Sequence, residues 1–137
     1  MFVPIDANKV IKIGMAYNTV SELIGESHII STQDMGNGYK WIKAWIYPFQ
    51  ERILANLCFD TEILEIIELY PHINSLETVS SWDNTSEKQL NDEKKMCDKW
   101  INKNKKQLPD EISTFKDLRS WSAGVVIKKD ENSNYPK

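Results

Sequence analysis

Histidine, cysteine and glycine are scarce in this sequence, and each scarcity argues against a class of function. The two histidines, His28 and His72, have no motif partner, and HExxH, paired CxxC and EF-hand patterns are absent, so we expect no metal site and no cofactor. The cysteines, Cys58 and Cys97, are far apart, which favours buried reduced thiols over a disulfide. None of the 5 glycines belongs to a phosphate-binding loop. We therefore expect no enzyme, although a scattered Cys/His or Ser/His/Asp site stays open as an alternative.

Long apolar runs are also missing. No stretch approaches the roughly 18 residues that a membrane-spanning helix requires. In "MFVPIDANKVIKIG", Pro4, Asp6 and Asn8 interrupt the apolar core that a signal peptide would need. We expect a cytoplasmic protein that does not contact a membrane.

The overall composition is that of an ordinary globular protein. With 137 residues, of which 41% are hydrophobic and 27% charged, the chain can bury a sizeable core without disulfides or metals, so we expect one domain over residues 1–137. The net charge of −3 argues against a general nucleic-acid binder, because such proteins usually carry a positive field. A basic partner is favoured instead.

Hydrophobic periodicity predicts an α+β fold. The expected elements are a short helix over 15–24, strands over 28–33, 39–47, 52–59 and 62–70, a long helix over 86–108 and a strand over 121–129. Gly25 is expected to end the first helix, and Pro109 follows the long one. The segment 62–70 would also make a helical stripe, but its β-branched residues favour a strand. The prediction is an antiparallel sheet of about four to five strands in a meander, with a short N-terminal helix and one long helix packed on the sheet.

The strand "YKWIKAWIYP", Tyr39 to Pro48, is apolar on both faces. At a period of two, one face carries Ile42, Ala44 and Ile46, and the other carries Tyr39, Trp41, Lys43, Trp45 and Tyr47. The first face is expected to be core. The aromatic face has two interpretations. It is either covered by Trp100 and Ile101 of the long helix, or it is a surface that binds a partner.

Acidic residues are concentrated in two short segments. The denser group comprises Asp60, Glu62, Glu65 and Glu68, and the second comprises Asp83, Glu87, Asp92 and Glu93 at the start of the long helix. Glutamates in such a segment most often form a solvated face, while partner binding and acid–base catalysis are the alternatives for the first group. The helix dipole accounts for part of the second group.

Two resemblances add to these patterns. "KIGMAYNTVSELIGES" followed by "FDTEILEI" resembles the opening module of outer-membrane assembly lipoproteins of the small-protein-A type. We do not expect a lipoprotein, because we recognise neither a signal peptide nor an acylated N-terminal cysteine in the sequence. The whole layout, closing with "SWSAGVVIKKDENSNYPK", is similar to small Asn/Lys/Ile-rich immunity proteins of bacterial contact-dependent or polymorphic toxin systems.

The second resemblance implies a cytoplasmic immunity protein that binds a cognate toxin domain, often a nuclease with a basic cleft, and blocks its active site or substrate groove. Its expected partner-binding residues are Asp60, Glu62, Glu65 and Glu68, with Trp41 and Trp45 as aromatic anchors. Direct nucleic-acid contact is not expected. The alternative is a module that binds a small ligand or single-stranded nucleic acid on the aromatic strand face.

Overall fold

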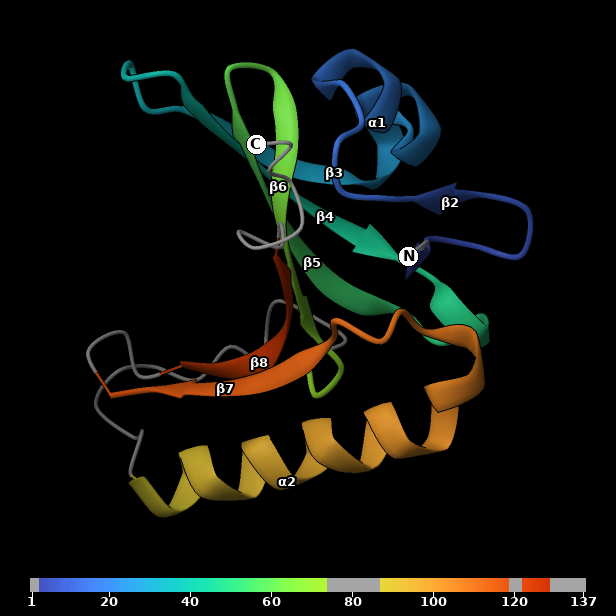
Figure 1. Ribbon diagram of the computed structural model, residues 1–137, viewed down its shortest axis with the longest axis vertical. Coiled ribbons are helices and arrows are strands. Elements are labelled where there is room, and N and C mark those ends of the chain that lie inside the picture. The colour runs from blue at the N-terminus through green and yellow to red at the C-terminus, as the bar shows by residue number, and fades with distance from the viewer. Residues whose placement is uncertain (1–2, 74–86, 119–121, 129–137) are drawn as a thin grey trace, which may run out of the picture.

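The fold is α+β, as the sequence predicts. The computed structural model describes residues 3–73, 87–118 and 122–128, which form a six-stranded antiparallel sheet, a short helix and a long helix (Figure 1). Asp83, Ser86 at the start of the predicted long helix, and both ends of the predicted last strand lie outside these residues.

Four consecutive strands form the predicted meander. They are β3 (Ile29–Asp34), β4 (Tyr39–Ile46), β5 (Ile53–Asp60) and β6 (Ile63–Tyr70). Gly36 and Gly38 have φ of 78° and 94° in the β3–β4 turn, a conformation that glycine adopts without a steric penalty. Thr61 and Glu62 both have positive φ between β5 and β6, as in a tight hairpin turn. The segment 62–70 is therefore a strand and not a helix.

The chain then returns to the sheet as a hairpin beside β6. Strand β8 (Ser122–Lys128) pairs with β6, and β7 (Ser113–Asp117) lies outside it, which gives the order β3-β4-β5-β6-β8-β7. The expected count of four to five strands was too low because β7 was missed. In β7, Phe115 is the one large apolar side chain among polar and charged neighbours, so the segment lacks a strand-like hydrophobic pattern.

Helix α2 (Glu87–Asn104) packs on β7 and β8, along the lower edge of the molecule in Figure 1. Its buried stripe includes Leu90, Cys97 and Trp100. Trp100 and Ile101 pack in the core on the helix side of the sheet, where the ring of Trp100 contacts Phe49 with centroids 5.8 Å apart. Trp41 and Trp45 alternate with the buried core residues of β4 and so point to the opposite face. The interpretation of those tryptophans as core beneath the long helix is therefore wrong.

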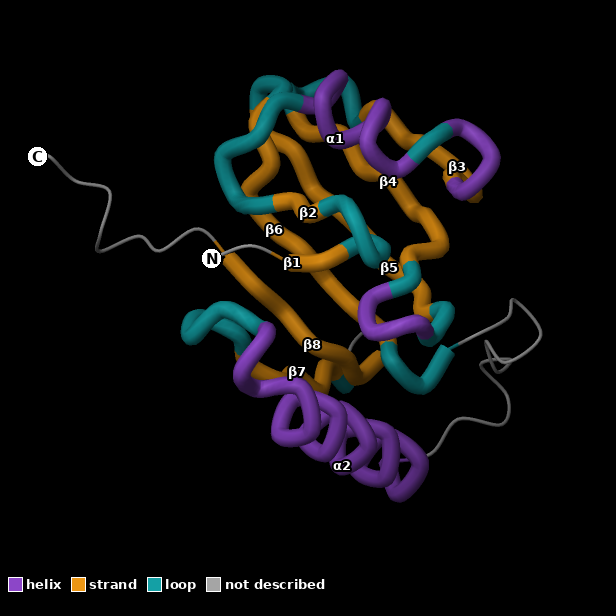
Figure 2. Tube along the Cα trace, turned by 90° about the vertical axis from the view of Figure 1, so that its right-hand side faces the viewer, coloured by secondary structure: helices purple, strands orange, loops and turns teal. Residues whose placement is uncertain are grey.

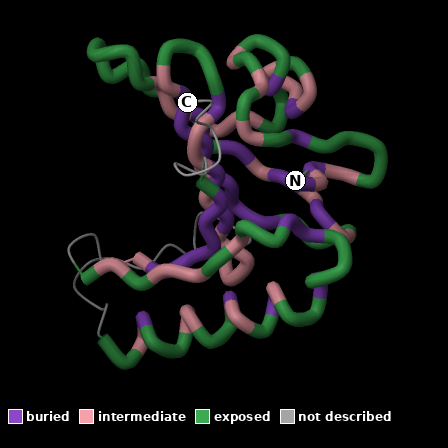
Figure 3. The backbone as a smooth tube through the Cα atoms, viewed as in Figure 1, coloured by how far each residue is buried: buried purple, intermediate pink, exposed green. Residues whose placement is uncertain are grey.

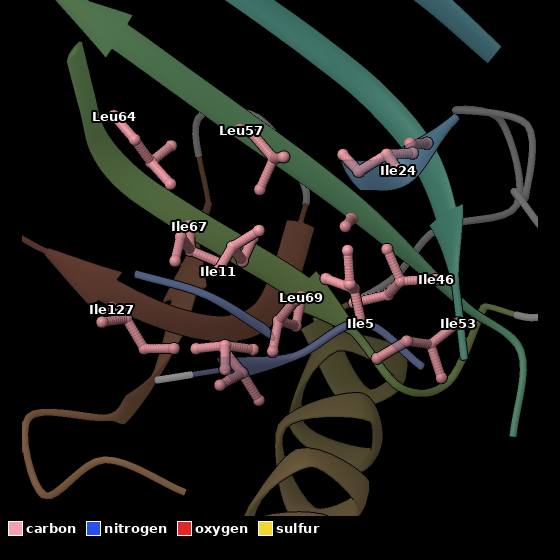
Figure 4. Close-up of a cluster of buried hydrophobic side chains, with 14 of the residues drawn as sticks. Ile5, Ile11, Ile24, Ile46, Ile53, Leu57, Leu64, Ile67, Leu69 and Ile127 are labelled. Carbon is pink, nitrogen blue, oxygen red and sulfur yellow. The ribbon is translucent and has the colours of Figure 1, made fainter. Parts of the chain in front are cut away.

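The remaining N-terminal elements cover the rest of the same sheet face. They are β1 (Val3–Pro4), β2 (Val10–Ile11) and α1 (Tyr17–Ile24), the last followed by Gly25 with φ of 88° (Figure 2). Ile5 and Ile11 lie against Leu57, Ile67 and other aliphatic side chains of the sheet (Figure 4). Ile42, Ala44 and Ile46 of β4 are fully buried there, as predicted. This face is the hydrophobic core.

Burial is uneven along the sheet. The central strands are buried, whereas the β3–β4 hairpin and the outer side of α2 are exposed (Figure 3). Met35 at the hairpin tip is 49% exposed. Exposure therefore increases from the central strands of the sheet toward the tip of the β3–β4 hairpin.

Candidate partner-binding face

The sheet face opposite α1 and α2 is called the open face here, because neither helix lies on it. Its middle is a row of residues that are neighbours from strand to strand across all six strands: Ser31, Lys43, Asn56, Glu68, Val126 and Ser113. Trp41 lies opposite Cys58 and Trp45 opposite Leu54 on either side of this row. Because side chains alternate along each strand, both predicted anchors lie on the open face.

Two adjoining hollows mark the open face. The larger encloses about 640 Å³ and is lined by Asn56, Glu68, Tyr70, Phe115, Lys116, Asp117, Ser122, Val126 and Lys128. The smaller, of about 250 Å³, is lined by Ser31, Gln33, Met35, Trp41, Lys43 and Asn56. Asn56 lines both, so the two hollows adjoin each other.

Glu68 is held in a fixed orientation between the strands. Its Oε1 atom accepts hydrogen bonds from Asn56 Nδ2 at 3.3 Å and from Tyr70 Oη at 2.9 Å. Burial, reinforced by the charge of Glu68, raises the pKa of Tyr70, so its phenol stays protonated and acts as the donor. The carboxylate of Glu68 is thereby positioned at the centre of the open face.

Two further predicted carboxylates lie near Glu68. Burial raises the pKa of Cys58, and the negative charges of Glu65, Glu68 and Asp60 raise it further. Asp60 lies two positions after Cys58 on β5, and Glu65 precedes Ile66, which pairs with Cys58 from β6. These carboxylates create a negative region beside Trp41, which lies opposite Cys58.

Glu62, the fourth predicted carboxylate, is directed elsewhere. It forms an ion pair with Lys40, and this hydrogen bond raises the pKa of Lys40. The Lys40 ammonium lies 4.9 Å from the ring centroid of Tyr17 in α1, so the pair belongs to the helix side of the sheet. The structure therefore separates Glu62 from the other three carboxylates.

The two predicted aromatic anchors differ in their surroundings. The Arg52 guanidinium lies 4.5 Å from the ring centroid of Trp45 and occupies one face of the indole. Trp41 instead lines the smaller hollow, next to the exposed Met35. Trp41 is thus the better placed of the two to contact another molecule.

A buried polar cluster that spacing did not predict joins β6 to α2. His72, just after β6, lies 3.1 Å from Glu93 Oε2 through Nε2 and 3.7 Å from Cys97 Sγ through Nδ1. Burial lowers the pKa of His72 to about 4 and raises that of Cys97 to about 12. A neutral imidazole that donates to Glu93 and accepts from the thiol satisfies all three groups.

This cluster contains the residue types of a cysteine nucleophile with a base, but its properties are the reverse of those of an activated site. Catalysis needs a thiolate that a substrate can reach, whereas Cys97 is fully buried and its pKa is raised. Within residues 3–73, 87–118 and 122–128, no group of three or more His, Cys, Asp or Glu side chains is arranged to hold a metal ion. The cluster is best described as a structural link between strand and helix.

Sequence reasoning missed Asn56, Tyr70 and Phe115 in the candidate site. Asn56 could have been recognised from the sequence, because it is the one amide in the otherwise apolar strand "ILANLCF". In the structure it pairs with strands on both sides. Tyr70 and Phe115 lie 45 positions apart in sequence, yet their ring centroids are 6.2 Å apart. Only the pairing of β8 between their strands brings them together.

Comparisons with known proteins identify no relative. The chain matches no protein-family model, no curated protein and no solved structure. Of the helices described, none is both long and apolar enough to cross a membrane.

Proposed function

We propose that this protein is an immunity-type inhibitor that binds a cognate toxin domain through the open face and blocks the toxin's active site or substrate groove. The observation that carries the proposal is that Trp41 and Glu68 line adjoining hollows on one sheet face, with Asp60 and Glu65 near Cys58, the cross-strand partner of Trp41. A concave face with an aromatic anchor and several carboxylates is suited to a convex, basic partner.

The electrostatics favour a nuclease-type toxin. Clefts that bind nucleic acid are lined with Lys and Arg, and carboxylates can occupy the positions of phosphates. The net charge of −3 adds a long-range attraction that accelerates encounter with a basic partner. Trp41 would supply contact area that slows dissociation.

Co-expression with the toxin domain encoded directly upstream tests the proposal. We expect a stable complex by size-exclusion chromatography and loss of toxin activity. Trp41→Ala and the pair Glu65→Gln/Glu68→Gln should each weaken the complex by about tenfold or more. Glu62→Gln is the control for the loss of one carboxylate from the same hairpin, because its side chain lies on the helix side, and it should change affinity less than about twofold.

Two results would contradict the proposal. The first is the absence of any complex with the upstream product. The second is an equal loss of affinity in the Glu62→Gln control and in the open-face variants, which would mean that the open face is not the interface.

Single-stranded nucleic acid is the second candidate ligand, favoured by the position of Lys43 beside Trp41 in the smaller hollow. Arg52 on the ring of Trp45 and the three carboxylates near Cys58 oppose it. Titration with single-stranded RNA separates the two functions. A nucleic-acid binder would show tryptophan quenching that weakens steeply with salt, whereas the immunity function predicts no response.

A further inference from the structure

We propose that the larger hollow of the open face seats an arginine side chain of the bound partner, with Glu68 as the acceptor. This inference rests on the proposed function and adds the chemical group that is recognised. The hollow, of about 640 Å³, is large enough for a guanidinium and its methylene stem, and Glu68 lies in the central row of the sheet.

The hydrogen bonds of Glu68 leave an acceptor available for a ligand. Asn56 and Tyr70 both donate to Oε1 and so fix the carboxylate, and among the described residues Oε2 makes no hydrogen bond. Asn56 donates through Nδ2, so its Oδ1 atom is a second acceptor beside the carboxylate. A guanidinium carries five donors in a plane and can reach two such acceptors at once.

An aromatic wall favours a planar cation. Tyr70 and Phe115 meet edge to face, with ring centroids 6.2 Å apart and an interplanar angle of 83°. Both rings pack directly on Gly124, where a Cβ atom would lie within 3.0 Å of each. The wall is therefore rigid, and arginine stacks on aromatic rings more readily than lysine does.

The charges around the hollow also favour a cation. Lys116 donates to Asn91 Oδ1 at 2.8 Å and lies 3.7 Å from Glu87, so its ammonium is directed toward α2. Lys128 remains as a positive charge at the hollow. The lining also carries two carboxylates, those of Glu68 and Asp117, which outnumber it. Removal of Lys128 should consequently strengthen the seat.

The test is a ¹H–¹⁵N NMR titration of the full chain at low salt with N-acetyl-arginine-N-methylamide. We expect saturable shifts at the Asn56 side-chain amide and at the backbone amides of Glu68, Tyr70 and Gly124. Glu68→Gln should weaken binding about tenfold, because a charge-assisted hydrogen bond is lost while the acceptor for Tyr70 and Asn56 is kept. Lys128→Ala should strengthen binding severalfold, and Glu62→Gln should leave it unchanged. The equivalent capped lysine should bind more weakly than arginine.

Absence of saturable, localised shifts in the wild type would overturn the arginine seat. Equal affinity in wild type and Glu68→Gln, with matching urea midpoints for the two proteins, would also overturn it. If Glu68→Gln leaves the affinity for the toxin domain unchanged, the arginine seat is overturned and the immunity function stays in place. Capped arginine that binds as expected without any toxin complex would support the seat and contradict the immunity function.

Discussion

The Nδ1 atom of His72 lies 3.7 Å from the Sγ atom of Cys97, so the end of β6 is joined to the middle of α2 through two buried side chains. The other imidazole nitrogen, Nε2, lies 3.1 Å from Oε2 of Glu93. Since these residues belong to different elements, their contact fixes where the long helix lies relative to the meander.

The pH dependence of stability should reflect His72. Its pKa is about 4 in the folded protein and 6.5 when unfolded, so the unfolded state binds the proton first as the pH falls. The contribution of His72 to the free energy of unfolding is fully present well above pH 6.5 and should fall by about 2 kcal/mol by pH 5. The raised pKa of Glu93 acts in the opposite sense, because the folded state binds that proton more readily.

Urea unfolding of wild type and His72→Gln at pH 7.5 and pH 5 measures this effect. Glu93 remains in both proteins, so the difference between their pH slopes belongs to His72. Parallel slopes would show that the imidazole is not held neutral in the folded protein.

Both thiols should be unreactive in the folded state. Cys58 and Cys97 are buried, and burial raises the pKa of each, that of Cys97 to about 12. Since the thiolate is the reactive form, an aromatic disulfide reagent at pH 8 should label neither thiol until the protein unfolds. Fast labelling of one thiol in native buffer would contradict the described burial, and the Cys58→Ser and Cys97→Ser variants would identify which.

A side chain at position 124 should destabilise the fold. In Gly124→Ala the new Cβ atom would lie 2.9 Å from Tyr70 Cε1 and 3.0 Å from both Leu69 O and Phe115 Cε1. We expect a loss of about 1–3 kcal/mol in urea unfolding, the usual cost of overpacking. Adding Phe115→Leu should recover part of the loss, since it removes one of the two rings. A cost within about 0.5 kcal/mol of zero, as at an unconstrained surface site, would mean that the aromatic wall adapts.

The tryptophans should differ in their effect on stability. Trp100 is 7% exposed and packs in the core, so Trp100→Ala should cost about 3–5 kcal/mol. Trp41 lies half-buried on the open face, so Trp41→Ala should cost about 1–2 kcal/mol, within the ordinary range of point substitutions. Urea unfolding at pH 7.5 compares the two. Equal costs would indicate that the aromatic face of β4 is core after all.

The meander could be predicted because its signals are local. Alternation in "RILANLCF", the glycines of "MGNG" and the β-branched residues of "EILEIIELY" each depend on residues within a few positions. Strand β7 could not be found in this way. Its position depends on pairing with β8 and on Thr114 Oγ1 donating to Asp98 Oδ1 of α2 at 2.8 Å.

The candidate site was only partly predictable for the same reason. Strand parity places Trp41 and Trp45 on one face, but it cannot show which face the long helix covers. The face to which a carboxylate near a turn points depends on the group that it pairs with. Glu62 pairs with Lys40 on the helix side of the sheet, away from the other carboxylates. The contacts of Glu68 with Asn56 and Tyr70 required the register of β5 and β6.

The central position of β6 also has a consequence for the order in which the chain folds. Strands β3 to β6 pair with their nearest neighbours in sequence, but Ile67 pairs with Ile127, 60 positions later. Closing so long a loop is slow compared with forming hairpins. Until β8 arrives, the backbone edge of β6 is without a neighbour, and during synthesis this edge stays available for mispairing until the ribosome has released residues 122–128.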